Sequence, residues 1–178
     1  MKIAITGHRP DAFLVSHYED SQVKRIADDI VCVFKREFGD DLCFNLGGST
    51  GVDQWVGSAC IEHGVKYHLF LPFLPQVQNK FWDEECKLEL DRQMKNAAGI
   101  TISDLSGKYI PELYQVRNKL MVDSSHFLVA FWVGKRRGGT YNTIKYALEK
   151  SKFVYNALND RKPINIADLK KGWTPPTV

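Results

Sequence analysis

Apolar residues follow two different spacing patterns along the chain, and these patterns alternate. Short continuous runs, of which Ile3-Ala4-Ile5 is the first, are separated by stretches in which apolar residues recur at three- and four-residue steps. A continuous run is typical of a strand buried on both faces, and the stepped spacing is typical of one face of a helix. The expected strands are 3–5, 43–46, 67–71, 99–102 (at an edge), 127–133 and 153–157. The expected helices are 23–38, 52–63, 81–96, 110–124, 141–150 and 166–171, the fourth with Leu113, Val116, Leu120 and Met121 at core spacing.

This alternation favours an α/β fold, namely a Rossmann-like, doubly wound, mainly parallel sheet flanked by helices on both faces. The length of 178 residues suits one domain, since domains usually hold about 100–200 residues. We therefore expect a single domain over 1–178, with the tail 160–178 at its periphery.

Three glycine-marked turns each follow an expected strand and precede a helix. They are Gly7-His8-Arg9-Pro10, the segment from Gly47 to Asp53 (Gly-Gly-Ser-Thr-Gly-Val-Asp), and Gly138-Gly139-Thr140. In an open parallel sheet, turns of this kind gather at one edge, where helix N-termini offer unpaired N–H groups to an anion. The pattern therefore predicts a phosphate or nucleotide site built from all three turns.

Individual residues in these turns allow two interpretations. Ser49 or Thr50 could donate to a phosphate or could cap the following helix. Asp53 could complement the helix dipole or bond a ribose hydroxyl. His8 and Arg9, at the end of a strand, are expected to face the ligand.

Further candidates lie outside the turns. Arg117, beside apolar positions of its helix, needs an anionic partner, either an internal carboxylate or a ligand, and Asn118 adds a hydrogen-bonding group next to it. Pro72-Phe73 and Trp82 could form a wall against a base, or could be ordinary core residues. Lys135-Arg136-Arg137 could attract anions or form a solvated loop.

Composition narrows the class of protein. The net charge of +3 is small for a dedicated nucleic-acid binder, and no apolar run reaches the about 20 residues of a membrane span. The four cysteines are scattered without a CxxC pair, which indicates a reduced, cytoplasmic protein without a disulfide framework or zinc site. His8 has no second metal ligand at suitable spacing.

These residues together resemble the SLOG superfamily, the Rossmann-like proteins named for the DNA-processing protein A (Smf) and Lonely Guy families, and within it the YpsA-like branch. The resemblance covers about residues 1–156. It rests on Ile5-Thr6-Gly7-His8-Arg9-Pro10, the 47–53 segment, Leu71-Pro72-Phe73, the segment from Arg117 to Asp123, and the segment from Gly138 to Asn142.

The resemblance implies a nucleotide-like ligand at the strand C-termini and a homodimer. Thr50 stands where the DNA-processing proteins usually carry arginine, and His126 stands where relatives often carry aspartate. Arg117 and the 138–140 loop are similar to parts of the Lonely Guy phosphoribohydrolase motif. That motif carries a glutamate where this chain has Asn142 and Thr143, and hydrolysis through an oxocarbenium-like state needs such a carboxylate.

The leading hypothesis is a sensor or carrier of a nucleotide or ADP-ribose-like ligand, with no further cofactor. Arg9, Arg117 and the N–H groups at 48–51 and 138–140 would hold phosphate, Asp53 a ribose, and Phe73 or Trp82 the base. The alternative is a nucleoside-monophosphate N-glycosidase or ribosyl transferase of Lonely Guy type, with Asp53 as catalytic carboxylate. A third hypothesis is single-stranded DNA binding through Lys135, Arg136 and Arg137.

Overall fold

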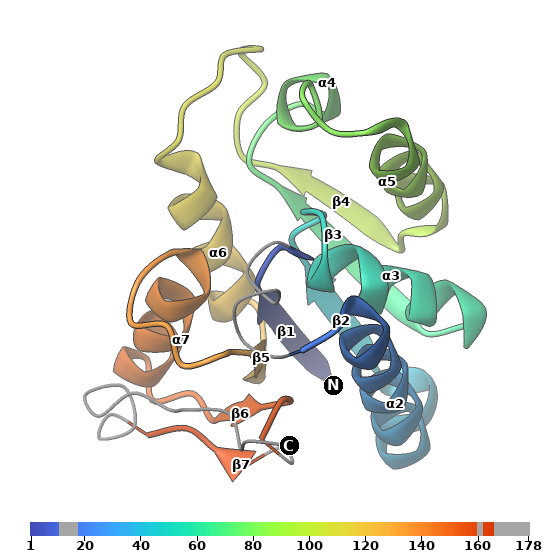
Figure 1. Ribbon diagram of the computed structural model, residues 1–178, viewed down its shortest axis with the longest axis vertical. Coiled ribbons are helices and arrows are strands. Elements are labelled where there is room, and N and C mark those ends of the chain that lie inside the picture. Colours follow the sequence, from blue (N-terminus) through green and yellow to red (C-terminus); the bar gives the residue numbers. More distant parts are fainter. Residues whose placement is uncertain (11–17, 160–161, 166–178) are drawn as a thin grey trace.

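The computed structural model describes residues 1–10, 18–159 and 162–165. Within them, seven strands form one sheet in the order β4-β3-β2-β1-β5-β6-β7 (Figure 1). Neighbouring strands are parallel except that β7 runs antiparallel to β6, so the mainly parallel sheet expected from the sequence is confirmed. The strands are β1 (Lys2–Gly7), β2 (Cys43–Leu46), β3 (Lys66–Leu71), β4 (Gly99–Ile102), β5 (Phe127–Phe131), β6 (Val154–Asn156) and β7 (Lys162–Pro163).

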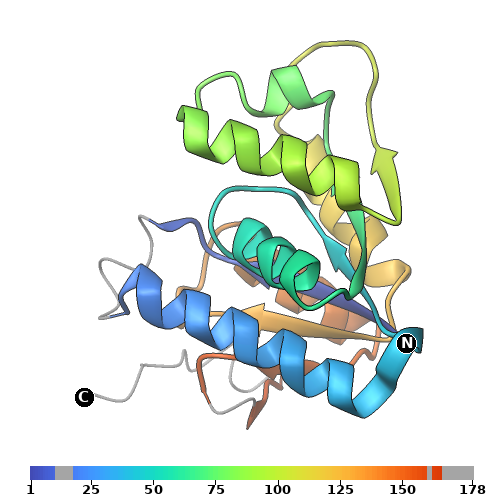
Figure 2. The same cartoon turned by 90° about the vertical axis from the view of Figure 1, so that its right-hand side faces the viewer.

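Helices cover both faces of this sheet. Figure 2 shows α2, α3 and α5 on one side, and Figure 1 shows α6 and α7 on the other. The described helices are α2 (Asp20–Phe38), the 3-10 turn η1 (Gly39–Asp41), α3 (Val52–Glu62), α4 (Pro75–Gln78), α5 (Glu84–Asn96), α6 (Leu113–Asp123) and α7 (Gly139–Glu149).

The alternation of side chains along each strand divides the core into two layers. Ile3 and Ile5 of β1 pack on one face with residues of α2 and α3, whereas Ala4 packs on the opposite face with residues of α6 and α7. Both sets are buried, because successive side chains of a strand point to opposite faces and both faces are covered. This explains why β1 and β5 are apolar without alternation.

The orientation of α6 differs from the sequence expectation. Val116 and Leu120 were expected on the core-facing side, but they are 43% and 40% exposed, while Arg117 is only 5% exposed. The helix is rotated so that Arg117 and Met121 face the sheet, because the guanidinium is held beneath the turn that follows β2.

The remaining differences are small. β7 adds a strand after 153–157, where none was expected, and α4 is a short helix in a stretch expected to be irregular. The helix expected at 166–171 and most of the tail 160–178 lie outside the described residues.

Candidate functional site

The ends of β1, β2 and β5 bring the three glycine turns to one edge of the sheet, since all three strands run in the same direction. A cavity of about 420 Å³ opens there. Ten of the residues expected at a ligand site line it: Gly7, His8, Arg9, Ser49, Thr50, Asp53, Arg117, Asn118, Gly139 and Thr140. Its other lining residues are Ile5, Thr6, Tyr114, Gln115 and Met121. Arg9, Thr50 and Thr140 therefore share one rim.

Two helices begin at this cavity with glycine at the N-cap. Gly51 (φ 86°) precedes α3 and Gly138 (φ 89°) precedes α7, and neither N-terminus has a side-chain capping hydrogen bond. Ser49 and Thr50 therefore do not cap α3, which corrects the capping interpretation of the two hydroxyls. The first N–H groups of both helices remain available to an anion, and both dipoles present their positive ends to the same space.

The glycines of the first two turns allow the backbone segments to pack closely. A Cβ on Gly51 would lie 2.8 Å from the carbonyl oxygen of His8, and a Cβ on Gly7 would lie 2.5 Å from the Cβ of Val52. The turn after β1 therefore sits directly against the start of α3. Larger residues at either position would separate the two turns and widen the cavity.

Arg117 supports the floor of the site. Its Nη1 donates to the carbonyl oxygens of Gly47 and Phe70, and its Nη2 donates to Ser49 Oγ at 3.3 Å. Its buried Nε has no hydrogen-bond partner. Burial lowers the pKa of Arg117, an effect opposed by the nearby Asp53 carboxylate.

Asp53 is held by the turn that precedes its own helix. Its Oδ2 accepts a hydrogen bond from Ser49 N at 3.2 Å. Burial raises the pKa of Asp53, and the opposing influences are the charge of Arg117, the Ser49 and Gly47 N–H groups and the charge of Arg9. The Asp53 side chain thus accepts a hydrogen bond from inside the turn over 47–53, and its charge acts on Arg117.

His8 and Arg9 line the cavity from the turn after β1. The Nε2 atom of His8 accepts a hydrogen bond from Val133 N at 3.4 Å, which links the turn after β1 to the end of β5. Arg9 is exposed at the rim, where its charge and a hydrogen bond lower the pKa of Tyr114, although burial of that phenol raises it more strongly. Arg9 is therefore the cation best placed to contact a ligand.

The other predicted residues lie outside the cavity lining. Phe73 is fully buried and packs at 5.3 Å from the rings of Tyr109 and Tyr114, and Trp82 is half-buried just before α5. The other predicted site residues outside the cavity lining are Pro72, Gly47, Gly48, Gly51, Gly138 and Asn142. Of these, Gly138 and Asn142 are exposed.

Tyr114 and Gln115 are the lining residues that the sequence did not single out. Tyr114 lies three positions before Arg117 on α6, with the guanidinium carbon 5.9 Å from its ring centre. An aromatic residue at this spacing from a candidate arginine was the available signal. Tyr114 thus lines the cavity, whereas Phe73 and Trp82 do not.

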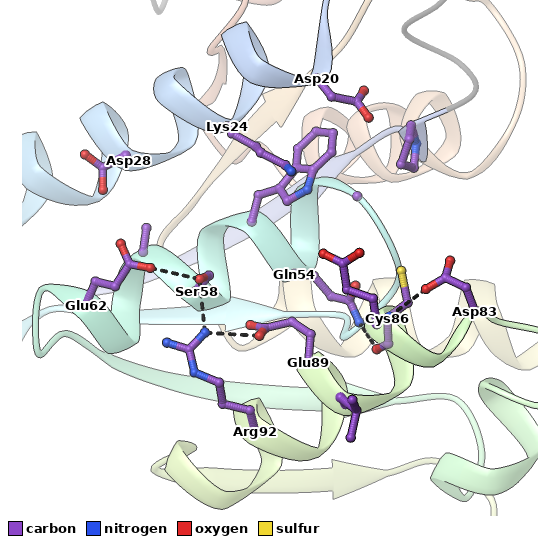
Figure 3. A pocket seen from close by; sticks show the side chains of 16 residues that line it. Asp20, Lys24, Asp28, Gln54, Ser58, Glu62, Asp83, Cys86, Glu89 and Arg92 are labelled. Atoms are coloured by element: carbon purple, nitrogen blue, oxygen red, sulfur yellow. Dashed lines mark hydrogen bonds and ion pairs between the residues drawn. The ribbon is translucent and has the colours of Figure 1, made fainter.

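A larger cavity of about 790 Å³ lies between α2, α3 and α5 (Figure 3). Trp55 of α3 is one of its lining residues. Arg92 links Glu89 at 3.0 Å to Ser58 at 3.2 Å. Acidic side chains outnumber the two basic ones, Lys24 and Arg92, and comprise Asp20, Asp28, Glu62, Asp83, Glu85 and Glu89. This groove would repel a phosphate, so the smaller cavity is the better anion site despite its volume.

Comparison with known proteins gives structural relatives only: no family model and no curated protein sequence matches the chain. None of the described helices has the length and apolar character needed to cross a bilayer. The fold is similar to DNA processing protein A (DprA) from Streptococcus pneumoniae, with 16% identity, a TM-score of 0.67, and coverage of 87% of this chain and 49% of that one. DprA from Helicobacter pylori, whose structure was described for its single-stranded DNA binding mode, gives 16% identity and a TM-score of 0.61 over 88% of this chain and 64% of that one.

A third similar structure is TM1055, a structural genomics target, with 16% identity, a TM-score of 0.56, and coverage of 94% of this chain and 88% of that one. The chain thus spans about half to two thirds of the two DprA chains. At this level of identity the likeness concerns the fold alone. It shows a Rossmann-like α/β fold and does not distinguish a YpsA-like branch.

Proposed function

We propose that the chain binds a nucleotide or nucleotide-derived ligand in the cavity of about 420 Å³ and acts as a sensor or carrier of that ligand. The proposal rests on one observation. Two helix N-termini, neither capped by a side chain, and the Arg9 side chain converge on this cavity. Each feature alone favours an anion, and a phosphate can use all three at once.

The lining assigns roles to parts of such a ligand. Arg9 and the N–H groups at the starts of α3 and α7 would hold the phosphate, with the Thr50 and Thr140 hydroxyls beside it. Tyr114 would contact the base or sugar, because its ring lies in the same lining. Arg117 would act through the turn that it supports. We place the chain in the YpsA-like branch of the SLOG proteins on the residues quoted above, and place its activity in the cytoplasm.

Thermal stabilisation with matched variants tests this proposal. AMP, ADP-ribose and cyclic dinucleotides are added to the wild type, to Arg9→Ala and to Arg136→Ala, which changes a basic residue of the loop between β5 and α7 outside the cavity lining. A ligand at one hundred times its dissociation constant stabilises the folded state by about 2.7 kcal/mol. We expect at least one compound to raise the melting temperature of the wild type and of Arg136→Ala but not of Arg9→Ala. Equal shifts in all three proteins, or none at millimolar ligand, would contradict the proposal.

Single-stranded DNA is the second candidate, favoured by the fold shared with the Helicobacter pylori protein and by the exposed Arg136 and Arg137 before α7. A DNA groove follows several phosphates, so its affinity falls steeply with salt. Loss of oligonucleotide binding in Arg136→Ala/Arg137→Ala, with mononucleotide binding unchanged, would favour DNA. Loss of oligonucleotide and mononucleotide binding in Arg9→Ala, with both retained in the double variant, would favour the small ligand.

A further inference from the structure

Three potential metal ligands meet on the outer side of the helix layer formed by α2 and α3. Asp28 and Cys32 lie one turn apart on α2, and His63 is the residue that ends α3. No sequence pattern pointed to this group, because its members come from two helices that only the fold brings together. In the part of the chain that the structure describes, it is the one group of three or more His, Cys, Asp and Glu side chains arranged to hold a metal ion.

The three donor atoms converge on one point. His63 Nε2 lies 2.6 Å from Asp28 Oδ1 and 3.3 Å from Cys32 Sγ, and all three atoms lie within 4.8 Å of one another. Both contacts involve the same ring nitrogen, so a single N–H cannot be directed at both partners. A Cys-His-Asp catalytic arrangement would instead use the two different nitrogens of the ring. A cation between the three atoms would use every donor.

We propose that Asp28, Cys32 and His63 bind a divalent metal ion of the zinc class, with solvent completing the coordination. A nitrogen, a sulfur and an oxygen donor form a set that suits zinc and cobalt, whereas magnesium and calcium prefer oxygen alone. This differs from the expectation, drawn from cysteine spacing, that the chain has no metal site. The proposal does not depend on the ligand of the cavity beside Arg9.

The side chains can reach metal-bonding distances without moving the helices. Bonds of about 2.0–2.3 Å to zinc separate the ligand atoms by roughly 3–4 Å, so the Oδ1 to Nε2 distance must open slightly. The side chains of His63 and Asp28 are 32% and 44% exposed, which leaves them room to adjust. Lys35 donates to the carbonyl oxygen of His63 and so holds the backbone of the third ligand.

The charge near the site favours a cation. The Asp28 carboxylate supplies a negative charge, and metal binding releases the Cys32 thiol proton to solvent. Asp28 also lines the acidic groove between α2, α3 and α5 (Figure 3), which offers the ion a route from the surface.

Cobalt substitution tests the site in the full chain. The protein is stripped with a chelator and titrated with Co²⁺, with absorption followed in the visible and near-ultraviolet, and Zn²⁺ is then added as competitor. We expect one equivalent of Co²⁺ to give intense visible bands of a low-coordinate site together with a sulfur-to-cobalt charge-transfer band, and Zn²⁺ to abolish both. Cys32→Ser should lose the charge-transfer band while keeping weaker binding, and His63→Ala should weaken binding at least about tenfold.

Cys86→Ser is the matched control, because Cys86 is a half-buried cysteine on α5 outside the group. It should leave the spectrum unchanged. Far-ultraviolet circular dichroism of every variant verifies that the fold is retained. The proposal is overturned if the spectrum is that of hydrated Co²⁺, if Cys32→Ser retains the charge-transfer band, or if the dissociation constant exceeds about 1 mM.

Discussion

The guanidinium of Arg117 occupies the space in which a side chain on Gly47 would begin. A Cβ on Gly47 would overlap Nη1 of Arg117 and would lie 2.7 Å from Asp53 Oδ2. The same Nη1 donates to the Gly47 carbonyl oxygen, so the absence of a side chain is what lets α6 and the turn after β2 meet. Glycine is therefore needed at position 47 to accommodate the Arg117 guanidinium, whether or not a phosphate binds nearby.

Replacing Gly47 by alanine should therefore destabilise the protein by about 2–4 kcal/mol, because Arg117 loses its carbonyl partners while remaining buried. Urea unfolding measures the change. Gly139→Ala is the control: a Cβ there meets only Asn118 Nδ2, at 3.9 Å, and alanine is a better helix former. Equal stability of the two variants would show that Arg117 can leave its site at little cost.

The arrangement of the turns could be predicted from the sequence, but the roles of their residues could not. The apolar runs predicted the parallel strands, and parallel strands place their C-terminal turns at one edge of the sheet. The side of α6 that faces the sheet depends on a contact between Arg117 and Gly47, 70 positions apart, and helical spacing alone favoured Val116 and Leu120 instead. Tyr114 was missed for the same reason, since it lines the cavity only because Arg117 turns that face inward.

Anion binding should strengthen as the pH falls through the pKa of Asp53. Burial raises this pKa in the folded protein, so the ionised carboxylate costs stability, and stability declines as the pH rises from the ordinary aspartate range through the raised value. A bound phosphate repels the carboxylate and raises its pKa further, so binding takes up a proton. The affinity for ADP-ribose, whose pyrophosphate stays fully ionised above the ordinary aspartate range, should decrease as the pH rises from that range through the raised pKa of Asp53.

Calorimetry of wild type and Asp53→Asn measures this dependence. His8 also lines the cavity, and its protonation favours anions too, so the contribution of Asp53 is the difference between the two pH profiles. If the affinity of Asp53→Asn falls as steeply with pH as that of the wild type, Asp53 keeps one charge state over the pH range measured. Base release from a nucleoside monophosphate that stops in Asp53→Asn would instead support the N-glycosidase alternative.

Cys86 should react slowly with alkylating reagents at neutral pH. Burial, a hydrogen bond to Asp83 and nearby carboxylates raise its pKa to about 11. The iodoacetamide rate at Cys86, followed by peptide mass spectrometry, should therefore rise about tenfold per pH unit well beyond pH 9. Asp83→Asn keeps an N-cap acceptor for Cys86 N but removes the charge, so it should accelerate the reaction. A rate that levels off near pH 8.5 in the wild type would contradict the raised pKa.

Gly57 and Gln93 form the contact that sets α5 against α3. Gln93 is fully buried, its Nε2 donates to the Gln54 carbonyl oxygen at 2.7 Å, and a Cβ on Gly57 would lie 2.5 Å from its Cδ. Gly57→Ala should lower the free energy of unfolding by about 1–3 kcal/mol despite the better helix propensity of alanine, because the amide is displaced from its partner. Ser58→Ala, one position along α3 at a half-buried site, should change it by less than about 1 kcal/mol. If Gly57→Ala were instead stabilising, helix propensity would outweigh the Gln93 contact, and α5 would be free to shift on α3.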